Sequence, residues 1–327
     1  MTSVIRIAIG LTALLTLTVL GCGDDAETPP PRGPLAEALG EIGGGGEHGS
    51  LGFGWTAPRL ASASDVGTRL MATALGPNAE TVVERAPAFR RRFGFDPLAA
   101  ERLVSVGGSY AFGLRLDGMD TPRLRDALIG AGGRVRNTDG LEILDVGGYA
   151  VVPEPLLRSG VRGIGARDAF GPGLTVLAIS VTARAALLGR GDRLLDEPIY
   201  RAAADCLGDV AAVRMVPERH LLSVEFGIDL VAIGVARQRE VLCVLGGTRE
   251  RAERTAAALR ASLAPGAREP RTGEPMGDLV RAVHVEPGSH EDVEVVRAEL
   301  RPAAGRPLGF LFATIARGSL VQLISGS

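Results

Sequence analysis

Hydrophobic and polar residues recur along this chain with two different periods. Continuous or alternating apolar runs, typical of strands, occur at 109–116, 222–236 and 240–245. Apolar residues spaced three and four apart, typical of helices, occur at 79–92, 121–132, 248–263 and 308–315. Single helices separated by strand hairpins predict an α+β fold, in which antiparallel sheets carry helices packed on one face.

Polar and glycine-containing turns divide the strand runs into hairpins. The predicted turns lie at 137–140, 237–239 and 287–288. The last of them separates two predicted strands, 280–286 and 293–300. Because short turns join antiparallel neighbours, these hairpins are the reason to expect antiparallel pairing.

A similar order of elements occurs twice. Strand 114–116 leads into a threonine-capped helix at 121–132, and strand 243–245 leads into a threonine-capped helix at 248–263. A strand hairpin follows each helix. The segments 43–55 and 207–216 are candidates for the matching first strands. This order suggests an internal duplication.

The amino-terminal residues have the pattern of a secretory signal. One cation, Arg6, precedes an apolar run from Ile7 to Leu20, which is shorter than the ~20 residues that cross a bilayer. The sequence Val19-Leu20-Gly21-Cys22 resembles the lipobox of bacterial lipoproteins. That resemblance implies removal of the leader before Cys22 and attachment of diacylglycerol and acyl groups such as palmitate to this cysteine. We therefore expect an extracytoplasmic protein, held at the cell membrane by a lipid on Cys22.

The residues after Cys22 are of low complexity. An acidic stretch at 23–28, three prolines at 29–31 and glycines at 43–46 are typical of a spacer, and a short helix is expected at 35–40. We expect this segment to hold a folded body away from the membrane. Four regions follow from these patterns: a signal peptide at 1–21, a tether at 22–50, and two α+β halves at 51–160 and 161–327.

Composition excludes several kinds of chemistry. The sequence contains no lysine, so its 36 basic residues are all arginines. A phosphate-binding P-loop, a lysine Schiff base and a Ser-x-x-Lys site are therefore excluded. A formal net charge of −2 gives no electrostatic reason to expect nucleic acid as a partner. No cofactor is predicted.

Two cysteines, Cys206 and Cys243, remain if Cys22 carries lipid. In an oxidising compartment they could form a disulfide, which would close a loop of about 38 residues and contribute ~4 kcal/mol. Both also lie in apolar stretches, where a free cysteine commonly packs as a small buried residue. The sequence leaves both alternatives open.

One group of residues has the chemistry of a metal site. Alternation along a strand would place His284 and Glu286 on the same face, and a turn at 287–288 could bring His290 toward them. Charged residues at the tip of a hairpin are, however, commonly only solvated. The spacing matches no established metal motif, so the three residues are a weak candidate.

The body of the chain resembles an uncharacterised class of bacterial surface proteins built from repeated α+β units. The segments Pro122–Leu128 and Leu194–Tyr200 carry this resemblance, which covers most of 51–300. That class has no established activity to transfer. With no set of catalytic residues identified, we expect a non-enzymatic role in binding an unknown protein or lipid partner or in envelope structure. Two alternatives are a carrier of a lipid or other apolar ligand, and a metal-dependent hydrolase that uses His284, Glu286 and His290.

Overall fold

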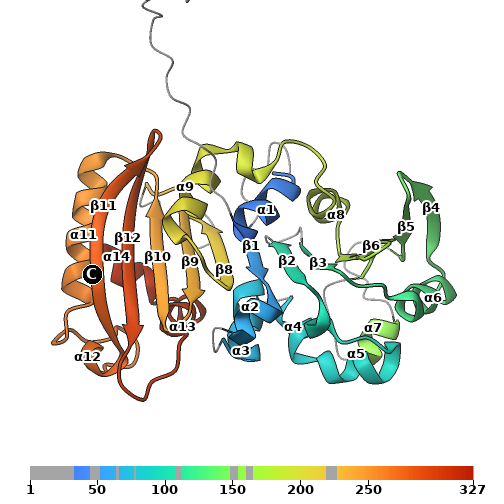
Figure 1. The fold of residues 1–327 in the computed structure, drawn as a ribbon, viewed down its shortest axis with the longest axis horizontal. Coiled ribbons are helices and arrows are strands. Elements are labelled where there is room, and N and C mark those ends of the chain that lie inside the picture. The colour runs from blue at the N-terminus through green and yellow to red at the C-terminus, as the bar shows by residue number, and fades with distance from the viewer. Residues whose placement is uncertain are drawn as a thin grey trace, which may run out of the picture. The chain divides into compact units, whose positions relative to one another are not determined.

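The computed structural model describes residues 33–44, 52–63, 66–76, 79–107, 112–147, 154–159, 165–218 and 227–326. Within these residues, twelve strands form one continuous antiparallel sheet (Figure 1). In the order in which they pair, the strands are β11 (Val280–His290), β12 (Val293–Pro302), β10 (Arg239–Leu245), β9 (Leu230–Ala236), β8 (Ala212–Pro217), β1 (Gly52–Thr56), β2 (Arg102–Gly107), β3 (Phe112–Asp117), β7 (Leu174–Ala178), β6 (Arg167–Gly171), β5 (Leu141–Asp145) and β4 (Arg134–Thr138). The mixed α+β class predicted from the sequence is consistent with this architecture.

Two strands that are distant in sequence, β1 and β8, pair at the middle of the sheet. Trp55 of β1 lies opposite Val213 of β8, and both side chains are fully buried. Residues Pro31–Ser327 form one compact unit. The boundary predicted at 160/161 does not divide this unit, because β6 continues the sheet beside β5.

Helices pack on both faces of the sheet, so the prediction of a single covered face was wrong. One face lies against α1 (Pro34–Glu41), α8 (Val181–Leu187), the 3₁₀ helix η3 (Leu194–Asp196) and α9 (Pro198–Leu207). The other lies against α2 (Pro58–Ala63), α3 (Thr68–Leu75), α4 (Glu80–Glu84), α5 (Ala86–Phe93), η2 (Pro97–Ala99), α6 (Pro122–Gly130), α7 (Glu154–Ser159), α11 (Arg249–Ser262), α12 (Met276–Leu279), α13 (Phe310–Arg317) and α14 (Leu320–Ser325).

Adjacent residues of β10 demonstrate the two covered faces. Cys243 packs in the cluster that contains α9, whereas Leu242 and Val244 pack in the cluster that contains α11. Every residue of β9 is buried for the same reason. A sheet covered on one face gives strands that alternate between apolar and polar residues, whereas a continuous apolar run indicates burial on both sides. The last seven residues of the strand predicted at 222–236, which form β9, carry that signal, and 222–226 lie outside the described residues.

The predicted tether at 22–50 is too long, because α1 belongs to the folded body. Leu35, Leu39 and Ile42 are buried in the cluster under α9. Their spacing of three and four residues forms an apolar stripe on one side of the helix. Prolines and glycines on either side of this short stripe gave it the appearance of a spacer.

Several local predictions are confirmed. The hairpin of β4 and β5 turns at Asp139 and Gly140, which both have positive φ, as a two-residue hairpin turn requires. The hairpin of β9 and β10 turns before Arg239. The helix predicted at 79–92 is broken into α4 and α5 at Arg85, just before Pro87.

The carboxyl-terminal helix α13 is attached to the sheet through a buried carboxylate. Glu240 of β10 accepts hydrogen bonds from the backbone N–H groups of Gly309 (2.7 Å), Phe310 (2.9 Å) and Leu311 (2.8 Å). These groups begin the helix and have no acceptor within it. Burial raises the pKa of Glu240, although the three hydrogen bonds act to lower it. A terminal helix was predicted at 308–315, but its attachment to Glu240 was not.

Candidate binding cleft

The structure brings Cys206 and Cys243 together in a disulfide, with a Cα–Cα distance of 6.3 Å. The bond joins the last turn of α9 to the middle of β10. The helix is thereby fixed on the face of the sheet that also carries α1. Cys22 lies outside the described residues.

The three candidate metal ligands do not converge. His284 Nε2 lies 2.6 Å from Glu286 Oε2, whereas His290 Nδ1 lies 3.2 Å from Asp205 Oδ2 on α9. Because β11 runs unbroken from Val280 to His290, the two histidines are six residues apart along one strand, roughly 20 Å. Among the described residues, no group of three or more His, Cys, Asp or Glu side chains is arranged to hold a metal ion.

The error lay in reading Pro287-Gly288 as a turn. The strand continues through Pro287, and the chain turns instead at Glu291 and Asp292. A proline has no N–H to donate, so it is tolerated in a strand at the edge of a sheet. The strand β11 is such an edge strand, with β12 as its one neighbour.

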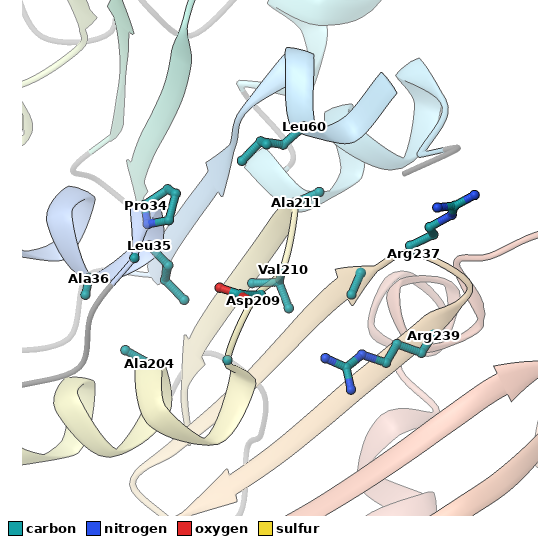
Figure 2. Close-up of a pocket in the computed structure, with 13 residues that line it drawn as sticks. Pro34, Leu35, Ala36, Leu60, Ala204, Asp209, Val210, Ala211, Arg237 and Arg239 are labelled. Carbon is teal, nitrogen blue, oxygen red and sulfur yellow. The ribbon is translucent and has the colours of Figure 1, made fainter. Parts of the chain in front are cut away.

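A cleft in the described part of the chain has a volume of about 510 Å³ (Figure 2). It lies where the beginning of α1, the end of α9, the start of β8 and the β9–β10 turn meet, with α2 beside them. Its lining is mostly apolar and comprises Gly33, Pro34, Leu35, Ala36, Leu60, Ala204, Gly208, Asp209, Val210, Ala211, Ala236, Arg237 and Arg239. A volume of 300–1,000 Å³ is typical of small-molecule sites.

Local sequence explains how these walls come together. Pro34 occupies the first turn of α1, where its missing N–H and fixed φ favour the start of a helix. Gly208 ends α9 with φ 63°, a conformation that glycine adopts without steric cost. The chain then passes through Asp209 and Val210 into β8. Leu60 of α2 is 42% exposed and contributes apolar surface to the cleft.

The position of α1 is fixed by ion pairs at its other end. Glu41 Oε2 lies 2.6 Å from an Nη2 of both Arg102 and Arg115, and both arginines also pair with Asp117. Burial acts to raise the pKa of Glu41, but the hydrogen bonds and charges of the two arginines hold it below its ordinary value. The same Glu41 accepts a hydrogen bond from Arg193 through its main-chain oxygen. The wall formed by α1 is therefore tied to β2 and β3.

Two arginines and one aspartate supply the charges of the cleft. Arg239 Nη1 donates to Glu299 Oε2 (3.0 Å), and the part of the chain described contains no further hydrogen bond from this guanidinium. Arg297 Nη2 also donates to Glu299 (3.1 Å). Burial acts to raise the pKa of Glu299, but the two arginines lower it overall. Figure 2 shows the Arg239 side chain extending toward the cleft and Arg237 turned away from it.

A second hollow of about 400 Å³ is acidic. It is lined by Glu197, Asp229, Asp292 and Glu294, together with the glycines 246 and 247. Burial, and then the charge of Asp192, raise the pKa of Glu197. The carboxylates of this hollow do not form a ligand set for a metal.

Sequence reasoning missed the main cleft. Arg237 and Arg239 were noted only as turn residues, and residues 34–36 were assigned to a tether. The one feature of the sequence that could have indicated a binding site here is the pair of arginines directly after a long apolar strand.

None of the helices in the described residues is long and apolar enough to cross a membrane. Comparison of the chain with protein-family models, curated proteins and solved structures finds no match.

Proposed function

We propose that this chain is a lipid-anchored extracytoplasmic protein that acts without catalysis, by binding a ligand in the cleft between α1, α9 and the β9–β10 turn. The cleft is the observation that carries the proposal, because its volume and apolar lining are those of a ligand site. The lipobox-like sequence ending at Cys22 supports the anchor. A disulfide between Cys206 and Cys243 supports an oxidising compartment.

The body is further proposed to consist of two similar halves. The order of strands supports this idea, since β1-β2-β3 and β8-β9-β10 are both three-stranded meanders that start at the middle of the sheet. In each half the third strand leads into a helix, α6 or α11. The chain then returns along the sheet until a later strand, β7 or β12, pairs with that third strand. On this proposal the cleft lies beside the junction of the halves.

A carrier of a lipid or other apolar ligand is the second candidate. The apolar lining of the cleft favours it over a site for a polar metabolite. We expect a carrier to retain its ligand during purification, and a site for a protein partner to be found empty. The hydrolase alternative is weaker, because His284 and His290 lie far apart along β11.

Native mass spectrometry of the full-length protein, extracted from its own host, tests the proposal. We expect a bound species of constant mass that is reduced in a Leu60→Ser variant and retained in an Arg91→Gln variant. Leu60 lines the cleft and is partly exposed, so the folded state should tolerate serine there. Arg91 is an exposed residue of α5 and does not line the cleft. Reproducible absence of any bound species would argue against the carrier. Binding that both variants leave unchanged would place the site elsewhere.

A further inference from the structure

The charges around the cleft define the chemistry of a ligand more closely than its volume does. The lining contains one carboxylate, Asp209, and two guanidinium groups, of which only that of Arg239 extends toward the cleft (Figure 2). The guanidinium of Arg239 uses one of its donors on Glu299, so it retains N–H groups for a second acceptor. Arg237 is exposed, and no ion pair holds it in the described residues. Arg239 therefore supplies the cleft with N–H donors beside an apolar surface.

The apolar part of the cleft lies beside Asp209, whose carboxylate is drawn between Leu35 and Val210, and away from the guanidinium of Arg239 (Figure 2). Its apolar side chains come from Leu35 of α1, Leu60 of α2 and Val210 before β8 (Figure 2). Burying methylene groups against such residues is favourable because it removes apolar surface from water. A ligand that satisfies both parts has an alkyl chain and a compact anionic group at one end.

Resting on the proposed function, we infer that the cleft binds an anionic amphiphile: an acyl chain along Leu35, Leu60 and Val210, with a carboxylate or phosphate at Arg239. Oxygen anions of both kinds match a guanidinium, which presents paired N–H donors in one plane. A protein anchored through Cys22 is held at a bilayer, whose lipids combine acyl chains with charged head groups. A free fatty acid and an anionic phospholipid share this chemistry.

Titration calorimetry with three soluble probes of equal chain length tests the inference. The probes are dodecanoate, dodecyl phosphate and dodecylammonium, each kept below its micellar concentration. The protein is the full mature chain carrying Cys22→Ser, so that no detergent is needed. We expect both anions to bind at least ten times more tightly than the cation. A preference for dodecanoate points to a fatty acid, and a preference for dodecyl phosphate points to a phospholipid head group.

Three substitutions act on this binding in different directions. Arg239→Gln removes a charged donor and should weaken both anions about tenfold, with little effect on the cation. Asp209→Asn removes a negative charge that repels the anionic probes, so both anions should bind about two- to threefold more tightly. Leu60→Ser removes apolar contact and should weaken all three probes by roughly three- to tenfold. Arg91→Gln is the matched control and should change nothing. Circular dichroism of each variant should match that of the parent chain, as a check that the variant is folded.

The opposite signs expected for Arg239→Gln and Asp209→Asn separate a charge effect from a loss of structure. Equal binding of the cation and the anions, or weaker anion binding in Asp209→Asn, would overturn the anionic assignment and leave the cleft as a ligand site. Failure of all three probes to bind the parent chain would overturn the inference and count against the proposed function. If Arg239→Gln and Leu60→Ser both leave binding unchanged, the binding site lies outside the cleft, and both the inference and the proposed function are contradicted.

Discussion

Replacing both disulfide cysteines with alanine should destabilise the body by ~4 kcal/mol. Cys206 and Cys243 lie 37 positions apart. In the chain-entropy model, closing a loop of this size lowers the conformational entropy of the unfolded chain and so raises the free energy of unfolding by ~4 kcal/mol. Alanine fills most of the same space, although Cys243 is fully buried and its loss of contacts adds to the effect. With a urea dependence of ~3 kcal/mol/M, the unfolding midpoint should fall by about 1.3 M.

Urea unfolding, followed by circular dichroism with and without dithiothreitol, measures this effect. The parent chain should lose stability in the reductant, whereas the Cys206→Ala/Cys243→Ala variant should give the same curve in both conditions. Titration of thiols in the unfolded, unreduced chain should find neither cysteine free. Two reactive thiols, or a parent curve that dithiothreitol does not move, would refute the reasoning and would weaken the argument for an oxidising compartment.

Two further substitutions test buried charges. Asp117→Asn removes a carboxylate that pairs with both Arg102 and Arg115, and we expect denaturation to show a loss of ~2 kcal/mol; Asp126→Asn, at an exposed site, should cost little. Burial raises the pKa of Asp168 well above its ordinary value, so its stabilising contribution is fully present below the unfolded pKa and is lost as pH rises through the folded pKa. Asp168→Asn should therefore remove part of the loss of stability that thermal melts show as pH rises above ~4, and an unchanged pH profile would contradict this.

Local elements were predictable because local sequence determines them. The turn at Asp139-Gly140 needs residues that tolerate positive φ, and the break before Pro87 follows from the missing N–H of proline. Each of these features depends on only a few neighbouring residues. Their prediction therefore did not require knowledge of the sheet.

Features that depend on the position of an element in the sheet were not predictable in the same way. Pro287 is a turn signal in isolation, and only its place on the edge strand β11 explains why the strand continues through it. The helix α1 looked like part of a spacer because its buried stripe is short. Its burial depends on α9, which lies far along the chain.

The cleft could not be predicted for the same reason. Leu35, Leu60, Val210 and Arg239 come from four separate segments, and no local pattern relates them. Their association depends on the pairing of β1 with β8 at the middle of the sheet. The sequence contains no short motif for that long-range contact.

Replacing Cys22 with serine tests the central claim, that a lipid on this residue holds a separately folded binding body at the membrane. Two or more acyl chains anchor a protein stably, and the residues at 23–31 offer no basic patch that could substitute for them. In detergent phase separation of host extracts, the parent chain should enter the detergent phase. The Cys22→Ser chain should enter the aqueous phase with unchanged thermal unfolding, or stay in the membrane only while its leader is uncleaved. A Cys22→Ser chain that remains membrane-bound after removal of the leader would contradict the account.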